Sequence, residues 1–466
     1  MGGPASIVFH SGGRTSSSLS DLVNGRTPID ALALAGWVLR WPPNKIDETP
    51  YRGVEAQLVT TPVRPERAAD AGAPPSLAEA PAFLRRALDD AVDVALKGVR
   101  RAAVMTGGGL DSSVMLGLTM RWAERTGGSA FAVSLDFEAP GDDRPHLAAM
   151  ERHLRCEVVR VTPEECAPQI AMLATGADAA PAYAATMPLE VEMLERARAN
   201  GAERLLSGAG GDELFGGEPR ALADIVLRGN PMRAMRAARR LRGFGDPRSP
   251  TWSWLVRPLI ARAIPTPVRV WRAQRHAPCD SPSWGGPVLR AFLDEKRRVL
   301  GVIHGRPART AQERFERIRD DDRRSILAWG RQLEEHLTGV DCWDPYLDLE
   351  LAASIARLPP EYLLMGDRWR GLLREAARDL LPETVRERMD KASVEPALRR
   401  FLDKAGGFAS LRPLASGREL ASLGLVEERA FEAAFDEFAA TPEDGVSWVG
   451  LWSALAVEAF LRGRKT

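Results

Sequence analysis

The sequence predicts an α/β fold in which a parallel β-sheet carries helices on both faces. Short apolar runs alternate with amphipathic helical patterns over residues 80–206, and strands that alternate with helices form parallel sheets with right-handed crossovers. Two of the apolar runs end in glycines followed by an acidic residue. Ligands of such sheets bind at the carboxyl ends of the strands, so we expect the functional site at these two turns. A small unit precedes this region, and a largely helical part follows it.

The composition is that of a folded protein without a strong electrostatic field. The 466 residues are 45% hydrophobic, and 63 basic residues balance 63 acidic ones. This balance gives no argument for nucleic acid or an anionic membrane as partner. No apolar run approaches the roughly 18 residues of a membrane span, and the four cysteines show neither a zinc-binding nor a disulfide pattern. We therefore expect a cytoplasmic protein without a membrane span.

Residues 1–78 are predicted to form a small unit of their own. Apolar runs predict strands at residues 7–10 and 54–59, and apolar residues at helical spacing predict a helix at residues 28–39. A stretch rich in Pro, Ala and Arg at residues 62–75 predicts a linker to the rest of the chain.

The sheet region opens with a helix. Ser76 and Glu79 form the pattern of a capping box, and the apolar residues that follow keep helical spacing to about residue 97. The predicted strands are the apolar runs at residues 102–105, 131–135, 157–161 and 205–206. The predicted helices between them cover residues 111–125 and 143–154.

The strand at residues 102–105 leads into TGGGLDSS at residues 106–113. Three consecutive glycines let the backbone approach an anion closely, and the first amides of the helix that follows are unpaired donors at the positive end of a dipole. An acid in this turn would repel phosphate directly, so we interpret Asp111 as a ligand of the Mg²⁺ that accompanies a nucleotide. A Gly-rich loop capped by Asp or Ser is the structural alternative.

The strand at residues 205–206 leads into a second turn of this kind, SGAGGDELFGG at residues 207–217. Taken alone, it is equally well explained by a helix-capping Asp. Parallel strands, however, place both turns at one edge of the sheet, and Asp111 and Asp212 are then expected to lie together. Two carboxylates with triphosphate oxygens and waters make an octahedral Mg²⁺ site.

Both turns resemble motifs of the asparagine synthetase family, whose members activate a carboxylate as its acyl-adenylate. GGGLDSS resembles the pyrophosphate loop SGGLDSS, with Gly107 in place of the leading Ser, and SGAGGDELFGG resembles SGEGADELFGG. No Gly-Lys-Ser/Thr follows the first turn, so it is not a Walker loop. The resemblance implies a sheet of the PP-loop ATP pyrophosphatase type, with ATP bound at the two turns and Asp111 and Asp212 on Mg²⁺. The residues expected beside the nucleotide are Met105, Thr106, Gly107, Gly108, Gly109, Asp111, Ser112, Ser113, Leu135, Ser207 and Gly208.

The C-terminal part carries further features of the family. DPYLD at residues 344–348 resembles a segment that precedes a helix, expected here at residues 349–357, and LPETVR at residues 381–386 resembles a family turn. Lys391 then falls where the family holds an essential lysine. A lone lysine in a charged stretch is usually solvated, but the matched position favours a catalytic role. Adenylation needs a cation beside the charge that develops on the α-phosphate and pyrophosphate.

The N-terminal unit stands where many relatives hold a glutaminase domain that begins with a catalytic Cys after Met1. Here Gly2 follows Met1, the segment is less than half the usual length, and residues 49–54 resemble the end of that domain. We interpret residues 1–78 as a truncated, degenerate glutaminase-like remnant and residues 79–466 as the synthetase domain. Glutamine is therefore not expected to supply nitrogen.

The motifs imply an enzyme that forms an amide by adenylating a carboxylate, releasing pyrophosphate and then AMP. Its amine is expected to be ammonia or a group of the substrate itself. β-Lactam synthetases carry a Tyr three residues before the second metal Asp and asparagine synthetases usually a Glu, whereas this chain has Ala209. A small residue there resembles the lasso peptide cyclases, which join an N-terminal amine to an Asp or Glu side chain, and it leaves room for a bulky peptide.

Macrolactam closure of a peptide is therefore the favoured function, and a protease or leader-peptide-binding protein of the same pathway is the partner that it implies. The first alternative is a synthetase that amidates the carboxylate of a small metabolite with ammonia. The second is a catalytically inactive scaffold, against which the intact Asp111, Asp212 and Lys391 argue.

Overall fold

The computed structural model describes most of the chain. The described residues are 6–39, 48–59, 75–138, 142–176, 178–182, 184–216, 220–227, 229–240, 255–257, 259–260, 264–276, 281–305, 311–319, 322–390, 393–440 and 448–464. The predicted linker at residues 62–75 lies outside them except for Pro75, and so does Lys391. Within these ranges no helix is both long enough and apolar enough to cross a membrane.

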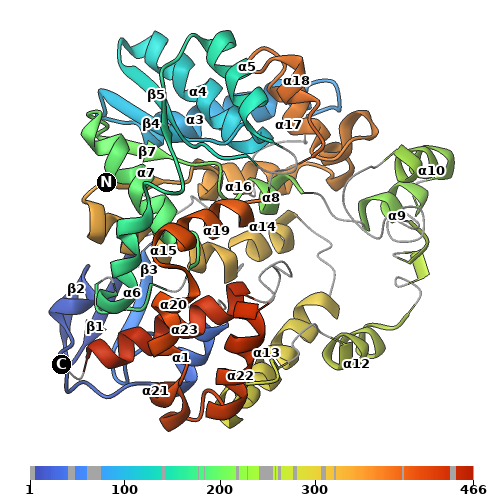
Figure 1. The fold of residues 1–466 in the computed structure, drawn as a ribbon. Coiled ribbons are helices and arrows are strands. Elements are labelled where there is room, and N and C mark those ends of the chain that lie inside the picture. Colours follow the sequence, from blue (N-terminus) through green and yellow to red (C-terminus); the bar gives the residue numbers. More distant parts are fainter. Residues whose placement is uncertain are drawn as a thin grey trace.

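A five-stranded parallel sheet forms the centre of the fold and confirms the predicted α/β class (Figure 1). Its strand order is β6-β5-β4-β7-β8. The strands are β4 (Arg101–Met105), β5 (Ser129–Leu135), β6 (Val158–Val161), β7 (Arg204–Leu206) and β8 (Asp341–Trp343). The first four were predicted. β8 was not, because Asp341-Cys342-Trp343 is not a continuous apolar run.

Both faces of the sheet are buried under helices. Along β4, Ala102 and Val104 belong to one hydrophobic core and Ala103 belongs to another, as the alternation of side chains along a strand requires. Burial on both faces explains why β4 is a continuous apolar run rather than an alternating one. The helices packed on the sheet are α3 (Ala80–Ala95), α4 (Leu110–Thr126), α5 (Arg144–Leu154) and α7 (Met187–Ala199).

The order of the strands reverses between β4 and β7. From β4 the chain moves outward through β5 to β6, and it then returns to add β7 and β8 on the other side of β4. In doubly wound sheets the crevice at such a reversal, beyond the carboxyl ends of the strands, is where ligands bind. The two Gly-rich turns follow β4 and β7, and both therefore lie at this crevice.

The N-terminal unit is a three-stranded antiparallel sheet of order β2-β1-β3 with one helix. Its elements are β1 (Ser6–Ser11), β2 (Arg14–Ser16), α1 (Ala31–Val38) and β3 (Glu55–Val59). Phe9 and Trp37 pack against Trp329 with ring centroids 5.2 Å apart, and both share a hydrophobic core with Trp452 near the C-terminus. The unit and the C-terminal helices are side by side in Figure 1, and a division of the chain near residue 78 stays a prediction.

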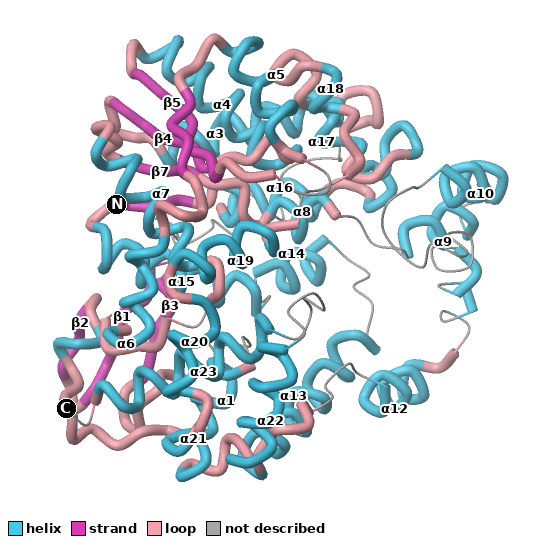
Figure 2. The backbone as a smooth tube through the Cα atoms, viewed as in Figure 1, coloured by secondary structure: helices cyan, strands magenta, loops and turns pink. Residues whose placement is uncertain are grey.

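The C-terminal part is helical, as predicted, and Figure 2 shows how its helices fill the space beside and below the parallel sheet. The expected helix at residues 349–357 is α16. The helices of this part are α13 (Pro287–Gly305), α14 (Ala311–Arg319), α15 (Asp322–Thr338), α16 (Leu349–Arg357), α17 (Gly371–Ala376), α18 (Glu383–Arg386), α19 (Glu395–Lys404), α20 (Gly407–Leu411), α21 (Arg418–Ser422), α22 (Glu428–Ala440) and α23 (Trp448–Gly463).

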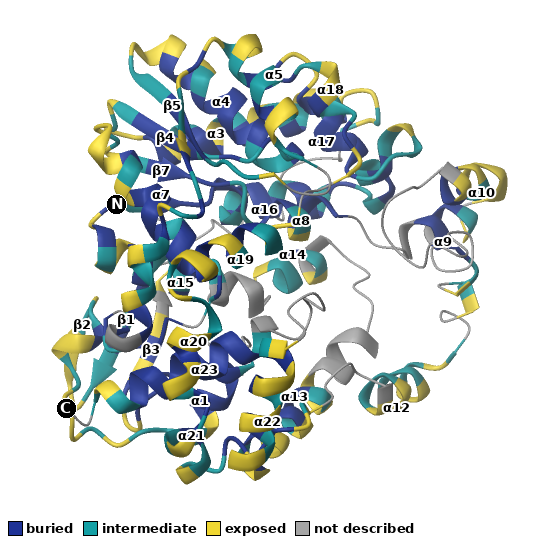
Figure 3. Ribbon diagram, viewed as in Figure 1, coloured by how far each residue is buried: buried dark blue, intermediate teal, exposed yellow. Residues whose placement is uncertain are grey.

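Three amphipathic helices stand apart from the sheet at the right of Figure 3. They are α9 (Arg220–Leu227), α10 (Pro231–Arg240) and α12 (Thr266–His276). In α10 the alanines Ala234, Ala237 and Ala238 are buried in a small third core, and Arg233 and Arg236 are exposed. This spacing is that of a helix with one solvated basic face.

Candidate nucleotide and metal site

The first Gly-rich turn packs so closely on α5 that it excludes side chains. Gly108 has φ +92°, and a Cβ atom on it would lie 2.9 Å from the backbone nitrogen of Leu147. A Cβ on Gly107 would lie 2.6 Å from Oδ2 of Asp143. A serine at position 107, as in the family motif, would require the Asp143 carboxylate to move.

Hydroxyl groups at the ends of the turn hold it in shape. The Thr106 hydroxyl donates to Ser112 Oγ at 3.1 Å and accepts from the backbone N–H of Gly108 at 3.3 Å. Thr106 and Ser113 are both buried, so they lie behind the turn. Ser112, in the first turn of α4, faces the cavity.

The second turn lies directly against the first. A Cβ atom on Gly208 would lie 2.6 Å from the Ser112 nitrogen, and one on Gly211 would lie 2.6 Å from Cγ of Asp111. Gly210 has φ +88°, a conformation that favours glycine. α8 (Gly211–Phe215) begins in this turn and carries Asp212 in its first turn. The glycines of the second motif thus allow two loops from neighbouring strands to touch at the two carboxylates.

We expect Gly211→Ala to lower turnover by about 100-fold, because the added methyl group must displace Asp111 and a misplacement of about 1 Å costs a rate factor of that order. Overpacking of this kind also destabilises the fold by about 1–3 kcal/mol. Steady-state kinetics and thermal unfolding measure the two effects. Gly330→Ala is the matched control, since nothing lies within 4 Å of its Cβ position in α15. Unchanged turnover of Gly211→Ala would show that the close contact is not needed.

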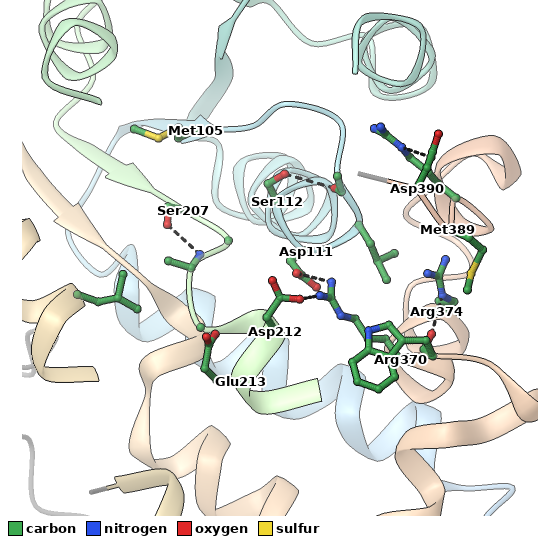
Figure 4. A pocket seen from close by; sticks show the side chains of 18 residues that line it. Met105, Asp111, Ser112, Ser207, Asp212, Glu213, Arg370, Arg374, Met389 and Asp390 are labelled. Atoms are coloured by element: carbon green, nitrogen blue, oxygen red, sulfur yellow. Dashed lines mark hydrogen bonds and ion pairs between the residues drawn. The ribbon is translucent and has the colours of Figure 1, made fainter. Parts of the chain in front are cut away.

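Asp111 and Asp212 converge, as predicted, and a guanidinium group lies between them (Figure 4). Arg370 Nη1 is 2.5 Å from Asp111 Oδ2, and Arg370 Nη2 forms an ion pair with Asp212 Oδ1. The Tyr346 hydroxyl donates to the carbonyl oxygen of Asp111 at 3.1 Å, which fixes the start of α4. One cation therefore reaches both carboxylates, and no arginine was predicted at this position.

The two carboxylates fit Mg²⁺ in number and in chemistry. Mg²⁺ prefers oxygen ligands and is usually held by one or two carboxylates, with substrate phosphates and waters completing the octahedron. Among the described residues no group of three or more His, Cys, Asp or Glu is placed to hold a metal ion. Asp111 and Asp212 are a pair of carboxylates of the kind that holds Mg²⁺ together with a triphosphate, and their metal role stays a prediction.

A second cation, Arg388, supports the pyrophosphate turn. Only 2% of its side chain is exposed, and its Nη1 lies 2.5 Å from Asp143 Oδ1 and 3.3 Å from the Gly108 carbonyl oxygen. Burial raises the pKa of Asp143, although the charge of Arg388 opposes this. Burial and then Arg388 lower the pKa of His146. Arg388 therefore places a buried guanidinium group against the first turn, and it was not predicted.

A buried ionic network holds the second turn from the other side. The Ser207 hydroxyl donates to Asp344 Oδ1 and accepts from the backbone N–H of Ala209 at 3.0 Å. Arg331 Nε donates to Asp344 Oδ2 at 2.9 Å, and its Nη2 donates to Ser207 Oγ at 3.1 Å. Ser207, predicted beside the nucleotide, therefore also fixes the shape of the turn, through a network that begins on α15.

A cavity of about 420 Å³ opens between the two turns and the segment before α17. Arg374, which lines it, is largely buried, and burial lowers its pKa to about 10. The described residues that line the cavity are Met105, Gly109, Leu110, Asp111, Ser112, Ser207, Gly208, Ala209, Gly210, Asp212, Glu213, Leu327, Trp369, Arg370, Arg374, Arg388, Met389 and Asp390. Of the eleven residues expected beside the nucleotide, Met105, Gly109, Asp111, Ser112, Ser207 and Gly208 line this cavity.

Comparison with known proteins identifies the family. A profile of the asparagine synthase family matches residues 83–462, which is more than half of the chain. The chain belongs to the asparagine synthase family. Similar solved structures include the U34-tRNA thiolase NcsA of Methanococcus maripaludis with its [4Fe-4S] cluster, at 15% sequence identity and a TM-score of 0.23, covering 56% of this chain and 80% of that one. No curated protein sequence matches the chain.

Membership of the asparagine synthase family confirms the resemblance carried by the two turns, and it makes the chain an ATP-dependent amide-forming ligase. The family uses ATP, and the crevice between β4 and β7 is where the fold offers a site for it.

Individual roles within this family site remain predictions. Thr106, Gly107, Gly108 and Ser113 belong to the first turn but are not among the described lining residues. Leu135 ends β5 and packs against a hydrophobic core, also outside that set. Lys391 lies outside the described residues.

Proposed function

We propose that this enzyme activates a carboxylate with ATP as an acyl-adenylate and closes a peptide macrolactam, in the manner of lasso peptide cyclases. The observation that carries the adenylation step is the contact of two Gly-rich turns at the switch point of the sheet, with Asp111 and Asp212 side by side. Ala209, a small residue lining the cavity where relatives carry Tyr or Glu, supports a peptide as the substrate.

The reaction has two steps. A carboxylate oxygen of the substrate attacks the α-phosphorus of ATP, and the bond from that phosphorus to the bridging oxygen breaks, so that pyrophosphate leaves. An amine of the same substrate then attacks the acyl carbon, loses a proton and expels AMP. The sum is one amide bond formed and one ATP converted to AMP and pyrophosphate.

The residues of the chain serve binding and orientation in this scheme. Backbone N–H groups of the first turn and the start of α4 would bind phosphate oxygens. Asp111 and Asp212 would hold Mg²⁺, which when bound neutralises charge on the triphosphate. Arg388 holds the first turn from behind, and the network of Arg331 and Asp344 holds the second. A preorganised site of this kind needs little rearrangement as charge develops.

Amidation of a small metabolite with free ammonia is the alternative. The cavity of about 420 Å³ is within the usual range of about 300–1,000 Å³ for small-molecule sites. We propose that either reaction takes place in the cytoplasm, where ATP is available. The free thiols of Cys156, Cys166 and Cys342 fit a reducing compartment.

With its substrate, the enzyme should form AMP and pyrophosphate in equal amounts, because an adenylating site transfers the AMP moiety. Chromatography of the nucleotides and a coupled pyrophosphate assay measure this. Formation of ADP and phosphate in step with product would contradict the acyl-adenylate mechanism and leave an acyl phosphate in its place.

The substrate class can be tested separately. A short precursor-peptide gene beside a small protease gene, next to the gene for this chain, would support the cyclase. The encoded core peptide should then lose one water molecule by mass spectrometry in an ATP-dependent reaction that ammonium salts do not accelerate. Product that forms only when ammonium is added would favour the metabolite synthetase.

A further inference from the structure

The guanidinium group of Arg370 lies between the two carboxylates that are proposed to hold a divalent cation. Each of its terminal nitrogens meets a different carboxylate, Asp111 on one side and Asp212 on the other. Arg370 is 8% exposed, and the side chain of Asp111 is 14% exposed and that of Asp212 40% exposed. Two carboxylates this close repel each other unless a cation lies between them, and here that cation is Arg370.

The backbone around Arg370 is built to hold it there. Arg370 has φ +53°, a left-handed conformation that non-glycine residues seldom adopt. A Cβ atom on Gly371 would collide with the carbonyl oxygen of Met365, so the chain doubles back tightly just before α17. Arg374 Nε donates to the carbonyl oxygen of Trp369 at 2.9 Å and closes the turn. Such backbone strain persists where the surroundings over-determine it, and it concentrates at functional sites.

We propose that Arg370 is an internal competitor of Mg²⁺ for Asp111 and Asp212. The proposal rests on the metal role given to these two carboxylates under the proposed function. The guanidinium and a metal ion cannot both occupy the space between the carboxylates, so the metal binds only when Arg370 moves away. The ligand-free enzyme then has a low affinity for divalent cations, although its two acidic ligands are already in place.

Binding of a nucleotide changes the competition between Arg370 and the metal ion for the two carboxylates. The triphosphate brings negative oxygens that attract the guanidinium and ligands that complete the metal coordination. Metal and nucleotide therefore assist each other, and the coupling is reciprocal: nucleotide raises metal affinity by the same factor as metal raises nucleotide affinity. Arg370 offsets one of the two negative charges in the absence of metal and makes metal binding depend on ATP.

The test is direct titration of the full-length protein with Mn²⁺, with free Mn²⁺ measured by electron paramagnetic resonance. It is run with and without a non-hydrolysable ATP analogue. Arg370→Gln should bind Mn²⁺ on the order of 10- to 100-fold more tightly than the wild type without nucleotide, the usual range of such couplings. The gain in Mn²⁺ affinity caused by the analogue should shrink by a similar factor.

Two variants control the titration. Arg125→Gln removes one positive charge at the surface, where 56% of the side chain is exposed, and leaves Asp111 and Asp212 with Arg370, so its Mn²⁺ affinity should stay near that of the wild type. Arg370→Lys keeps the charge as a single point that cannot pair with both carboxylates, and it should give an intermediate affinity. Thermal unfolding confirms that each variant is folded.

Two results would overturn the proposal. If Arg370→Gln and the wild type bind Mn²⁺ equally without nucleotide, while both bind it with the analogue, competition is disproved and the metal site stands. If neither binds Mn²⁺ under any condition, the metal role of Asp111 and Asp212 fails as well. Neither measurement requires turnover, so a failure of the acyl-adenylate mechanism would be seen separately, in the nucleotide products.

Discussion

Asp111→Asn and Asp212→Asn should each lower kcat by at least about 100-fold while leaving the fold intact. Each substitution removes one of the two carboxylates that we propose as ligands of Mg²⁺. A metal-triphosphate held by one carboxylate is misplaced, and a shift of about 1 Å costs on the order of 100-fold in rate. The fold should survive, because the remaining carboxylate still compensates the charge of Arg370.

Single-turnover and steady-state rates with ATP and substrate measure the loss, and thermal unfolding reports on the fold. Asp379→Asn is the matched control. This carboxylate forms ion pairs with Arg85 and Arg121 at the surface, with 65% of its side chain exposed, and its loss should change neither the rate nor the stability appreciably. Full activity of either Asp111→Asn or Asp212→Asn would remove that residue from the metal site.

The convergence of these two carboxylates could be predicted from sequence because it follows from topology. Each acid stands a few residues after a short apolar strand, and parallel strands end at the same edge of a sheet. The glycines at 208 and 211 add the physical reason for the contact, since either Cβ would collide with the first turn. The local sequence patterns, together with the rule that parallel strands end at the same edge of a sheet, were sufficient to predict that the two carboxylates converge.

The cations of the site could not be predicted in this way. Arg370 is 259 positions from its partner Asp111, and nothing in the sequence distinguishes it among 63 basic residues. The left-handed backbone conformation of Arg370 could not be read from the sequence either, because that conformation is typical of glycine and not of arginine. The one available sign was Gly371, which follows Arg370 and marks a tight turn.

Arg388 illustrates a sign that was present but not used. It stands three residues before Lys391, inside the stretch that resembled the family, and it is buried against the first turn through Asp143.

The strand β8 (Asp341–Trp343) was missed for another reason. Its first and last residues bond to each other, with Trp343 Nε1 donating to Asp341 Oδ1 at 2.7 Å. Its place in the sheet depends on pairing with β7, which is a long-range property.

Lys391→Ala should lower kcat by about 100- to 1,000-fold and change the KM for ATP little. In the sequence the lysine follows Met389 and Asp390, both of which line the cavity. An ammonium group on a flexible stem suits a site where charge grows on the α-phosphate and then on the tetrahedral intermediate. Loss of one such preorganised donor typically costs about 2.7–4 kcal/mol in the transition state.

The distinction between kcat and KM identifies the role, because an interaction made only in the transition state lowers kcat and kcat/KM together. Lys391→Arg should also be impaired, since a planar fork does not replace a point charge in a confined site. Lys404→Ala is the control, a lysine in the exposed last turn of α19. If Lys391→Ala raised the KM for ATP at unchanged kcat, the lysine would be a ligand of the bound nucleotide in the ground state. The charge that develops during adenylation would then have to be met by cations already at the cavity, Arg370 and Arg388.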